Sequence, residues 1–149
     1  DGAAPSGNSV AALNNLRLAR LIGQTDLEAV ADRVMRSSGD VAQQPTAHTL
    51  MMSAAAFAAG PSQEITIAGE RGAADTEALF DVLRDFYLPN AVVHLHTPDD
   101  GELAALAPYT EAQTMRDGQA TVYVCEDFAC QAPTTDPDEF AAQLRGALA

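Results

Sequence analysis

The chain has 149 residues, of which 47% are hydrophobic, so it can bury the core of one ordinary domain or two small subdomains and is not a disordered chain. Eight arginines, no lysine and 21 acidic residues give a formal charge of -13, which repels the phosphates of nucleic acids and of anionic membranes and argues against both as partners. Two cysteines are too few for a small secreted disulfide scaffold, and neither a signal peptide nor 18 uninterrupted apolar residues occur, so a cytoplasmic location is expected.

Three helices are predicted in the first part of the chain. Turn-forming residues lead into a first helix at about 9–22, which is capped by Asn8 or Ser9. A second helix begins at Thr25 or Asp26, and a third spans about 46–58. The second has the apolar stripe of an ordinary surface helix. The first and third are apolar on more than one side, which is typical of helices packed between two neighbours. A helical segment is therefore predicted at residues 1–61.

From residue 62 the pattern changes to short apolar strands that alternate with helices. Strands are expected at residues 65–68, 91–96 and 120–125, and the last helix has Asp136 as its N-cap and Pro137 at its first position. Alternation of this kind indicates βαβ crossovers, so residues 62–149 are predicted to form a small three-stranded, mostly parallel α/β sandwich. Placing the most hydrophobic strand at the centre gives the strand order 2-1-3, with 3-2-1 as the alternative.

Cys125 and Cys130 stand at the end of the third predicted strand. Four residues separate them, whereas the thiol-disulfide exchange motif has two, and the acidic neighbours Glu126 and Asp127 raise rather than lower a thiol pKa. Buried structural thiols are therefore the favoured interpretation, a disulfide is the second, and a metal-binding or catalytic role is the third.

Two histidines, His94 and His96, alternate on the second strand and so point to the same side of the sheet. With Cys125 and Cys130 they would make four ligands that suit zinc, but the spacing is not that of a zinc knuckle or ribbon. We interpret them as polar residues near a strand end, and likewise His48 at the start of a helix. No metal is predicted.

The loop Gly69-Glu-Arg-Gly72 lies between a strand and a helix, where phosphate-binding loops occur. It satisfies neither the Rossmann nor the Walker pattern, and Glu70 and Asp75 would repel a phosphate. A plain βα turn is therefore favoured, with an anion site at Arg71 as the alternative, and no cofactor is predicted.

Hydrogen-bonding side chains gather in the N-terminal loop, at Asp1, Ser6, Asn8 and Ser9. Such a loop can line a polar pocket. The chain has no nucleophile elbow and no pair of carboxylates that marks a glycosidase, so no catalytic residue is assigned.

Two segments carry a resemblance to a known family: DGAAPSGNSVA at residues 1–11 and YVCEDFACQAP at residues 123–133, with Asp136 beyond. Together they resemble the C-terminal part of the YyaL-like family of thioredoxin-domain proteins, whose animal members are called spermatogenesis-associated. The resemblance implies an upstream thioredoxin-like domain, a central (α/α)6 barrel similar to N-acylglucosamine 2-epimerases, and a small α/β tail. By this resemblance residues 1–61 are the end of the barrel, and the upstream domains of the same protein are the partners of this fragment.

Three functions follow as hypotheses. The leading one is a non-catalytic scaffold or interaction fragment that is not an enzyme by itself and whose exposed helix faces also allow a homo-oligomer. The second is a part of a sugar-binding or sugar-modifying barrel enzyme, to which Asp1, Asn8 and Ser9 contribute pocket groups. The third is a thiol-redox module that uses Cys125 and Cys130.

Overall fold

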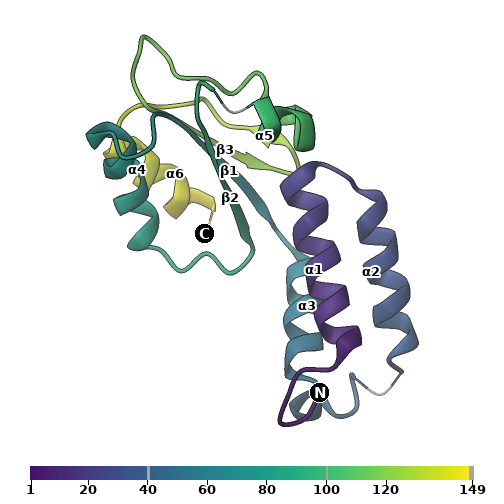
Figure 1. Cartoon of the computed structure of the whole chain (residues 1–149). Coiled ribbons are helices and arrows are strands. Elements are labelled where there is room, and N and C mark those ends of the chain that lie inside the picture. Colours follow the sequence, from purple (N-terminus) through teal and green to yellow (C-terminus); the bar gives the residue numbers. More distant parts are fainter. Residues whose placement is uncertain (40, 100, 148–149) are drawn as a thin grey trace. The chain divides into compact units, whose positions relative to one another are not determined.

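A computed structural model describes residues 1–39, 41–99 and 101–147 (Figure 1). The chain divides into two compact units, residues 1–62 and residues 63–149, and each is considered by itself. Within the described residues the first unit is helical and the second contains the sheet, so the fold is the mixed helical and α/β class predicted from the sequence.

The first unit is built around helix α1 (Gly7–Ile22), which packs against both α2 (Asp26–Ser37) and α3 (Thr49–Ala59), as its wide apolar surface predicts. A short 3-10 turn, η1 (Pro45–Ala47), precedes α3. Ser6 rather than Asn8 or Ser9 caps α1, because its hydroxyl accepts a hydrogen bond of 3.1 Å from the Ser9 amide. Gly23 ends α1 in the left-handed conformation, with φ of 70°.

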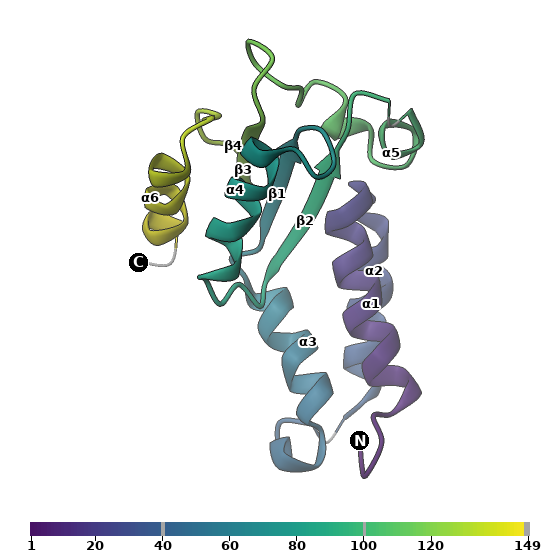
Figure 2. The same ribbon diagram turned by 60° about the vertical axis from the view of Figure 1, so that its left-hand side comes forward.

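The second unit contains strands β1 (Gln63–Ala68), β2 (Ala91–His96), β3 (Thr121–Glu126) and β4 (Ala129–Cys130). Its helices are α4 (Ala74–Arg84), α5 (Gly101–Leu106) and α6 (Pro137–Ala147), and a 3-10 turn, η2 (Pro108–Thr110), follows α5. The strand order is β2-β1-β3-β4, which confirms the predicted 2-1-3 arrangement with β1 between β2 and β3 (Figure 2).

The sheet is mixed rather than mostly parallel. Strands β1 and β2 are parallel and joined by α4, but β3 runs antiparallel to β1, and β4 forms a hairpin with β3. The expectation of three mostly parallel strands was wrong in these two respects. A strand of two residues is too short to show a period of two, and alternation of strands with helices does not fix the direction of the third strand.

Helices α4 and α6 cover one face of the sheet, and α5 lies on the other side (Figure 1). The covered face holds the hydrophobic core, which is formed by buried residues from β1, β3 and the two helices: Ile65, Ile67, Leu79, Val122, Val124, Phe140 and Leu144. Within the described ranges, no helix is both long and apolar enough to cross a bilayer.

Candidate functional site

The opposite face of the sheet carries polar side chains that are nevertheless buried. Side chains alternate between faces along a strand, so Glu64 and Thr66 of β1 point away from the core. The register sets Glu64 beside Cys125 of β3, and Thr66 between His94 of β2 and Tyr123 of β3. Glu64, Thr66 and Cys125 are at most 1% exposed. Polar groups buried to this degree usually have hydrogen-bond partners, but Oγ1 of Thr66 has none among the described residues.

Cys125 and Cys130 form a disulfide across the β3-β4 hairpin, where they are directly opposite each other with Cα atoms 3.8 Å apart. This is the second of the three interpretations made from the sequence rather than the favoured one of free thiols. The two turn residues, Asp127 and Phe128, have positive φ values of 49° and 61°. Cys125 is buried whereas Cys130 is exposed, so the two ends of the disulfide lie in different surroundings.

Gln113 connects the disulfide to the end of β2. Its side-chain Nε2 lies 3.6 Å from the sulfur atoms of both Cys125 and Cys130. Its backbone oxygen accepts a hydrogen bond of 2.7 Å from Nδ1 of His96, since a carbonyl can only accept. Gln113 is buried, and its Oε1 has no hydrogen-bond partner among the described residues.

An aromatic group lies beside Glu64. The Phe128 amide donates a hydrogen bond of 3.0 Å to Oε2 of Glu64. The Tyr109 ring makes edge-to-face contacts with the rings of Phe128 and His94, with centroid distances of 5.2 and 6.0 Å. Burial, and then the negative charge of Glu64, raise the pKa of Tyr109 well above its ordinary value. The Tyr109 phenol, like an ordinary phenol, carries its proton at neutral pH and can donate a hydrogen bond.

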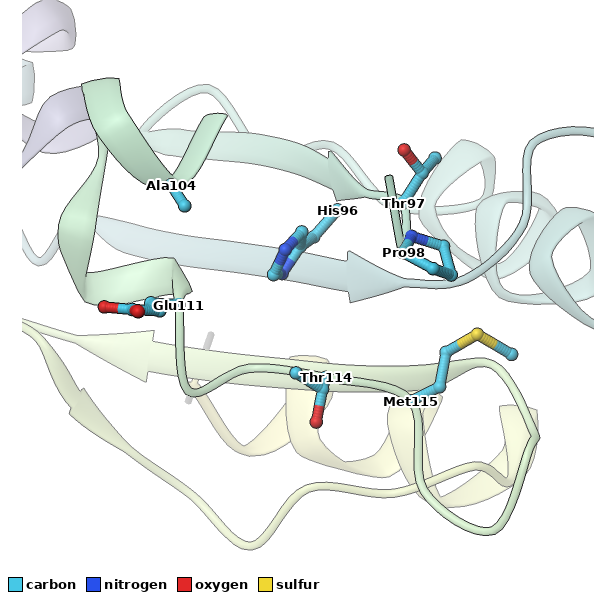
Figure 3. Close-up of a pocket in the computed structure, with 7 residues that line it drawn as sticks. All are labelled: His96, Thr97, Pro98, Ala104, Glu111, Thr114 and Met115. Atoms are coloured by element: carbon cyan, nitrogen blue, oxygen red, sulfur yellow. The ribbon is translucent and has the colours of Figure 1, made fainter. Parts of the chain in front are cut away.

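A hollow of about 320 Å³ opens at the carboxyl end of β2 (Figure 3). In open α/β sheets this edge is where ligands commonly bind. The hollow is lined by residues from the end of β2, from α5 and from the segment after η2: His96, Thr97, Pro98, Ala104, Glu111, Thr114 and Met115. It combines a half-buried imidazole, a carboxylate and three apolar side chains, which is the usual composition of a small-molecule site.

The loop Gly69–Gly72 lines a neighbouring hollow of about 590 Å³ with Glu70, Arg71, Thr97, Pro98 and Asp99. Of the described residues in this lining, Arg71 is the one cation and Glu70 and Asp99 are carboxylates, so the charges do not favour a phosphate. Gly69 has a packing role, because a Cβ at this position would lie 2.4 Å from Oγ1 of Thr76. This geometry suits the plain βα turn.

The four polar residues of the N-terminal loop, Asp1, Ser6, Asn8 and Ser9, line a hollow of about 310 Å³ in the first unit, together with His48 and Met51. The Asp1 carboxylate accepts hydrogen bonds from the amides of Leu50 and Met51 in the first turn of α3, at 2.9 and 3.2 Å. Asp1 and Ser6 therefore cap two helices, and their polar atoms are engaged in holding the unit together.

The predicted arrangement of His94 and His96 on one side of the sheet is found, but the two side chains have different contacts. His94 packs against Tyr109, and His96 bonds to Gln113. The four-ligand zinc alternative is not available, because cysteines in a disulfide have no thiolate to offer. Among the described residues, no group of three or more His, Cys, Asp or Glu side chains is placed to hold a metal ion.

Several residues of this face were not singled out from the sequence: Glu64, Tyr109, Gln113 and Phe128. One signal was present, since the polar residues Glu64 and Thr66 alternate with Ile65 and Ile67 and so mark a polar face on an otherwise apolar strand. Tyr109 lies in the short 3-10 turn η2 and Gln113 in the irregular segment after it, and neither stretch has a periodicity. Nothing in their sequence spacing relates them to the hairpin.

The comparisons with known proteins point to one family. No protein-family model and no solved structure matches the chain. Spermatogenesis-associated protein 20 of Homo sapiens is 36% identical over 153 aligned positions, which cover 97% of this chain but 19% of the human protein. The proteins of the same name from Rattus norvegicus and Mus musculus are 35% and 33% identical, and the chain covers 18% of each. The chain therefore belongs to the family of spermatogenesis-associated protein 20, as a fragment that corresponds to about a fifth of the length of these relatives.

Proposed function

We propose that this fragment is a non-catalytic interaction region whose apolar helix surface is covered by other parts of the same, longer protein. The observation that carries the proposal is the exposure of Val10 and Leu18 on α1, at 40% and 45%. Both lie on the side of α1 away from its buried residues, which are Ser9, Ala12, Leu16 and Ala19. The relatives are about five times as long as this chain, so they contain ample sequence to cover such a surface.

The energetics support a covered surface. Moving a leucine or valine side chain from water into an apolar contact contributes roughly 1.5–3 kcal/mol. Met52 on α3 is also 40% exposed, so the first unit offers further apolar area of the same kind. Because these three side chains are 40–45% exposed, covering each contributes less than half of that value, and the three together contribute on the order of 2–4 kcal/mol.

Sedimentation velocity over a concentration series, with binding of a hydrophobic dye, tests this proposal. We expect the isolated chain to bind dye and to associate as its concentration rises, and a version extended with the upstream sequence of its own protein to do neither. Leu18→Glu should reduce both effects. Ala29→Glu, which adds the same charge on an exposed position of α2, should leave them unchanged. A dilute monomer that is well folded and binds no dye would count against the proposal.

A second candidate function is thiol-disulfide exchange at the hairpin, and the unequal exposure of Cys125 and Cys130 favours it. A low-molecular-weight thiolate would attack Sγ of the exposed Cys130 and form a mixed disulfide there, while Cys125 leaves as the thiolate. The Gln113 amide, 3.6 Å from that sulfur, can donate a hydrogen bond to the leaving thiolate. A second thiol then releases Cys130, so two external thiols are oxidised to their disulfide and the protein gains two thiols.

Single-cysteine variants incubated with oxidised glutathione and followed by intact mass would test the exchange. The Cys125→Ser variant keeps only the exposed Cys130, and the Cys130→Ser variant keeps only the buried Cys125. The first should form the mixed disulfide at least about tenfold faster, because the reaction is limited by the access of glutathione to the thiol. Equal rates for the two variants would count against this function. So would a parent protein whose disulfide stays intact in excess reduced glutathione.

A further inference from the structure

The hollow at the carboxyl end of β2 presents hydrogen-bond acceptors to whatever enters it. His96 uses Nδ1 to donate to the Gln113 oxygen at 2.7 Å, so in the neutral imidazole the lone pair is on Nε2. Among the described residues, Nε2 has no hydrogen-bond partner. Glu111 adds a carboxylate that is an acceptor with negative charge. A ligand that satisfies both groups must be a hydrogen-bond donor, and a positive charge suits Glu111 best.

The remaining lining has room for a short hydrocarbon body. Pro98, Ala104 and Met115 contribute apolar surface, Thr97 and Thr114 contribute hydroxyl groups, and Met115 has a flexible side chain that adapts to the shape of a ligand. Figure 3 shows His96 with Thr97 and Pro98 on one side of it and Ala104 of α5 and Glu111 on the other, and the Glu111 carboxylate points away from the imidazole. The volume of about 320 Å³ is at the lower end of the range for small-ligand sites.

The negative charge of the chain and of the hollow argues against an anionic ligand. The whole chain has a formal charge of -13, and among the described residues that line this hollow Glu111 is the one formally charged side chain. An anion would therefore meet repulsion both from the hollow and from the surrounding field. Among the described lining residues a metal ion would find two side-chain ligands of the usual kind, His96 and Glu111, which are fewer than a stable site provides.

We propose that this hollow is a binding site for a small organic ammonium compound. Its ammonium group donates a hydrogen bond to Nε2 of His96, the negative charge of Glu111 attracts it to the hollow, and its hydrocarbon part lies against Ala104, Pro98 and Met115. Gln113 positions the imidazole through its backbone oxygen and thereby leaves Nε2 as the acceptor.

Three probes of the same carbon chain length and different charge test the proposal: n-butylamine, 1-butanol and butyrate. We expect n-butylammonium to bind with a Kd on the order of 1 mM, as five non-hydrogen atoms allow, and about tenfold more tightly than 1-butanol. Butyrate should bind more weakly than either. Titrations followed by 1H-15N NMR should show saturable shifts in His96, Ala104 and residues 111–115, with no shift in His48 of the other unit.

Two variants separate the pocket from the general charge of the protein. Glu111→Gln should weaken n-butylammonium binding about tenfold, to the level of the alcohol, and Ala104→Phe should abolish binding of all three probes by filling the space. Glu102→Gln, which removes the same charge on α5 outside the hollow, should leave the affinity within about twofold. The NMR spectrum itself verifies that each variant is folded. Equal binding of all three probes, shifts that map elsewhere, or equal effects of the Glu111 and Glu102 variants would overturn the proposal.

Discussion

The amide nitrogen of Phe128 donates a hydrogen bond of 3.0 Å to the carboxylate of Glu64, across 64 positions of the sequence. Glu64 is fully buried on the central strand, whereas Phe128 is in the hairpin turn with a positive φ of 61°. An L-residue with a side chain adopts this conformation at a cost, which the surrounding contacts must offset. The hydrogen bond to Glu64 and the ring contact with Tyr109 are two such contacts.

Replacing Glu64 should therefore loosen the hairpin. We expect Glu64→Leu to lower the free energy of unfolding by about 1–3 kcal/mol, because the partly buried Phe128 amide loses its acceptor. Glu64→Gln should cost less, since its amide oxygen still accepts that hydrogen bond. Urea denaturation followed by far-UV circular dichroism measures both. Glu70→Leu, on an exposed loop, should stay within about 0.5 kcal/mol of the parent, and a Glu64→Leu variant as stable as the parent would contradict the role of this carboxylate.

Removing the disulfide should affect the hairpin more than the sheet. The bond closes a ring of six residues, 125–130, and in the chain-entropy account such a ring contributes about 2 kcal/mol. We expect the double variant Cys125→Ala, Cys130→Ala to lose up to that amount while β1, β2 and β3 remain paired. Amide hydrogen exchange at Gln131, which bonds to the Val124 oxygen at 2.9 Å, should become faster. Unchanged protection of that amide would show that β4 pairs without the disulfide.

Much of the architecture could be predicted because it depends on local signals. The change from helical periodicity to short strands located the sheet, and Asp136 with Pro137 fixed the start of α6, where the Asp136 carboxylate accepts from the Asp138 amide at 2.8 Å. The strand order followed from hydrophobicity, since β1 is buried along its whole length. Each of these features is determined by the sequence of a single segment, and so it can be predicted without knowing the tertiary contacts.

The hairpin and the polar face could not be predicted because they depend on contacts between distant segments. A type I′ turn usually contains Asn-Gly or Asp-Gly, whereas here the two turn residues are Asp127 and Phe128, which gave no hairpin signal. Gln113 reaches the disulfide from an irregular segment 12 and 17 residues away. The partners of Glu64 are likewise set by tertiary structure.

Gly69 should not tolerate a side chain. A Cβ there would lie 2.4 Å from Oγ1 of Thr76 and 3.1 Å from Cβ of Ala120, so Gly69→Ala forces the Thr76 side chain or the segments around it to shift. We expect a loss of about 1–3 kcal/mol, as for overpacked cores, and partial recovery when Thr76→Ala is added. Thermal unfolding measures both. Gly7→Ala, in the first turn of α1 with open space around it, should be neutral or slightly stabilising, and a Gly69→Ala variant that behaves like it would refute the packing role.

Asp75 should make stability depend on pH in the acid range. Its carboxylate accepts hydrogen bonds from the amides of Ala120 at 2.8 Å and Thr76 at 2.9 Å, and the bond from Ala120 is the main reason that the pKa of Asp75 lies below its ordinary value. A carboxyl whose pKa is lower in the folded state stabilises the fold above its unfolded pKa of about 4, and this contribution is lost as the pH falls through the folded pKa. The parent should therefore be more stable than Asp75→Asn at neutral pH, and this difference in the free energy of unfolding should become smaller below about pH 4. Asp85→Asn, at an exposed position, should show no such change in urea denaturation at the same pH values, and a pH-independent difference for Asp75→Asn would mean that the charge of this carboxylate does not contribute.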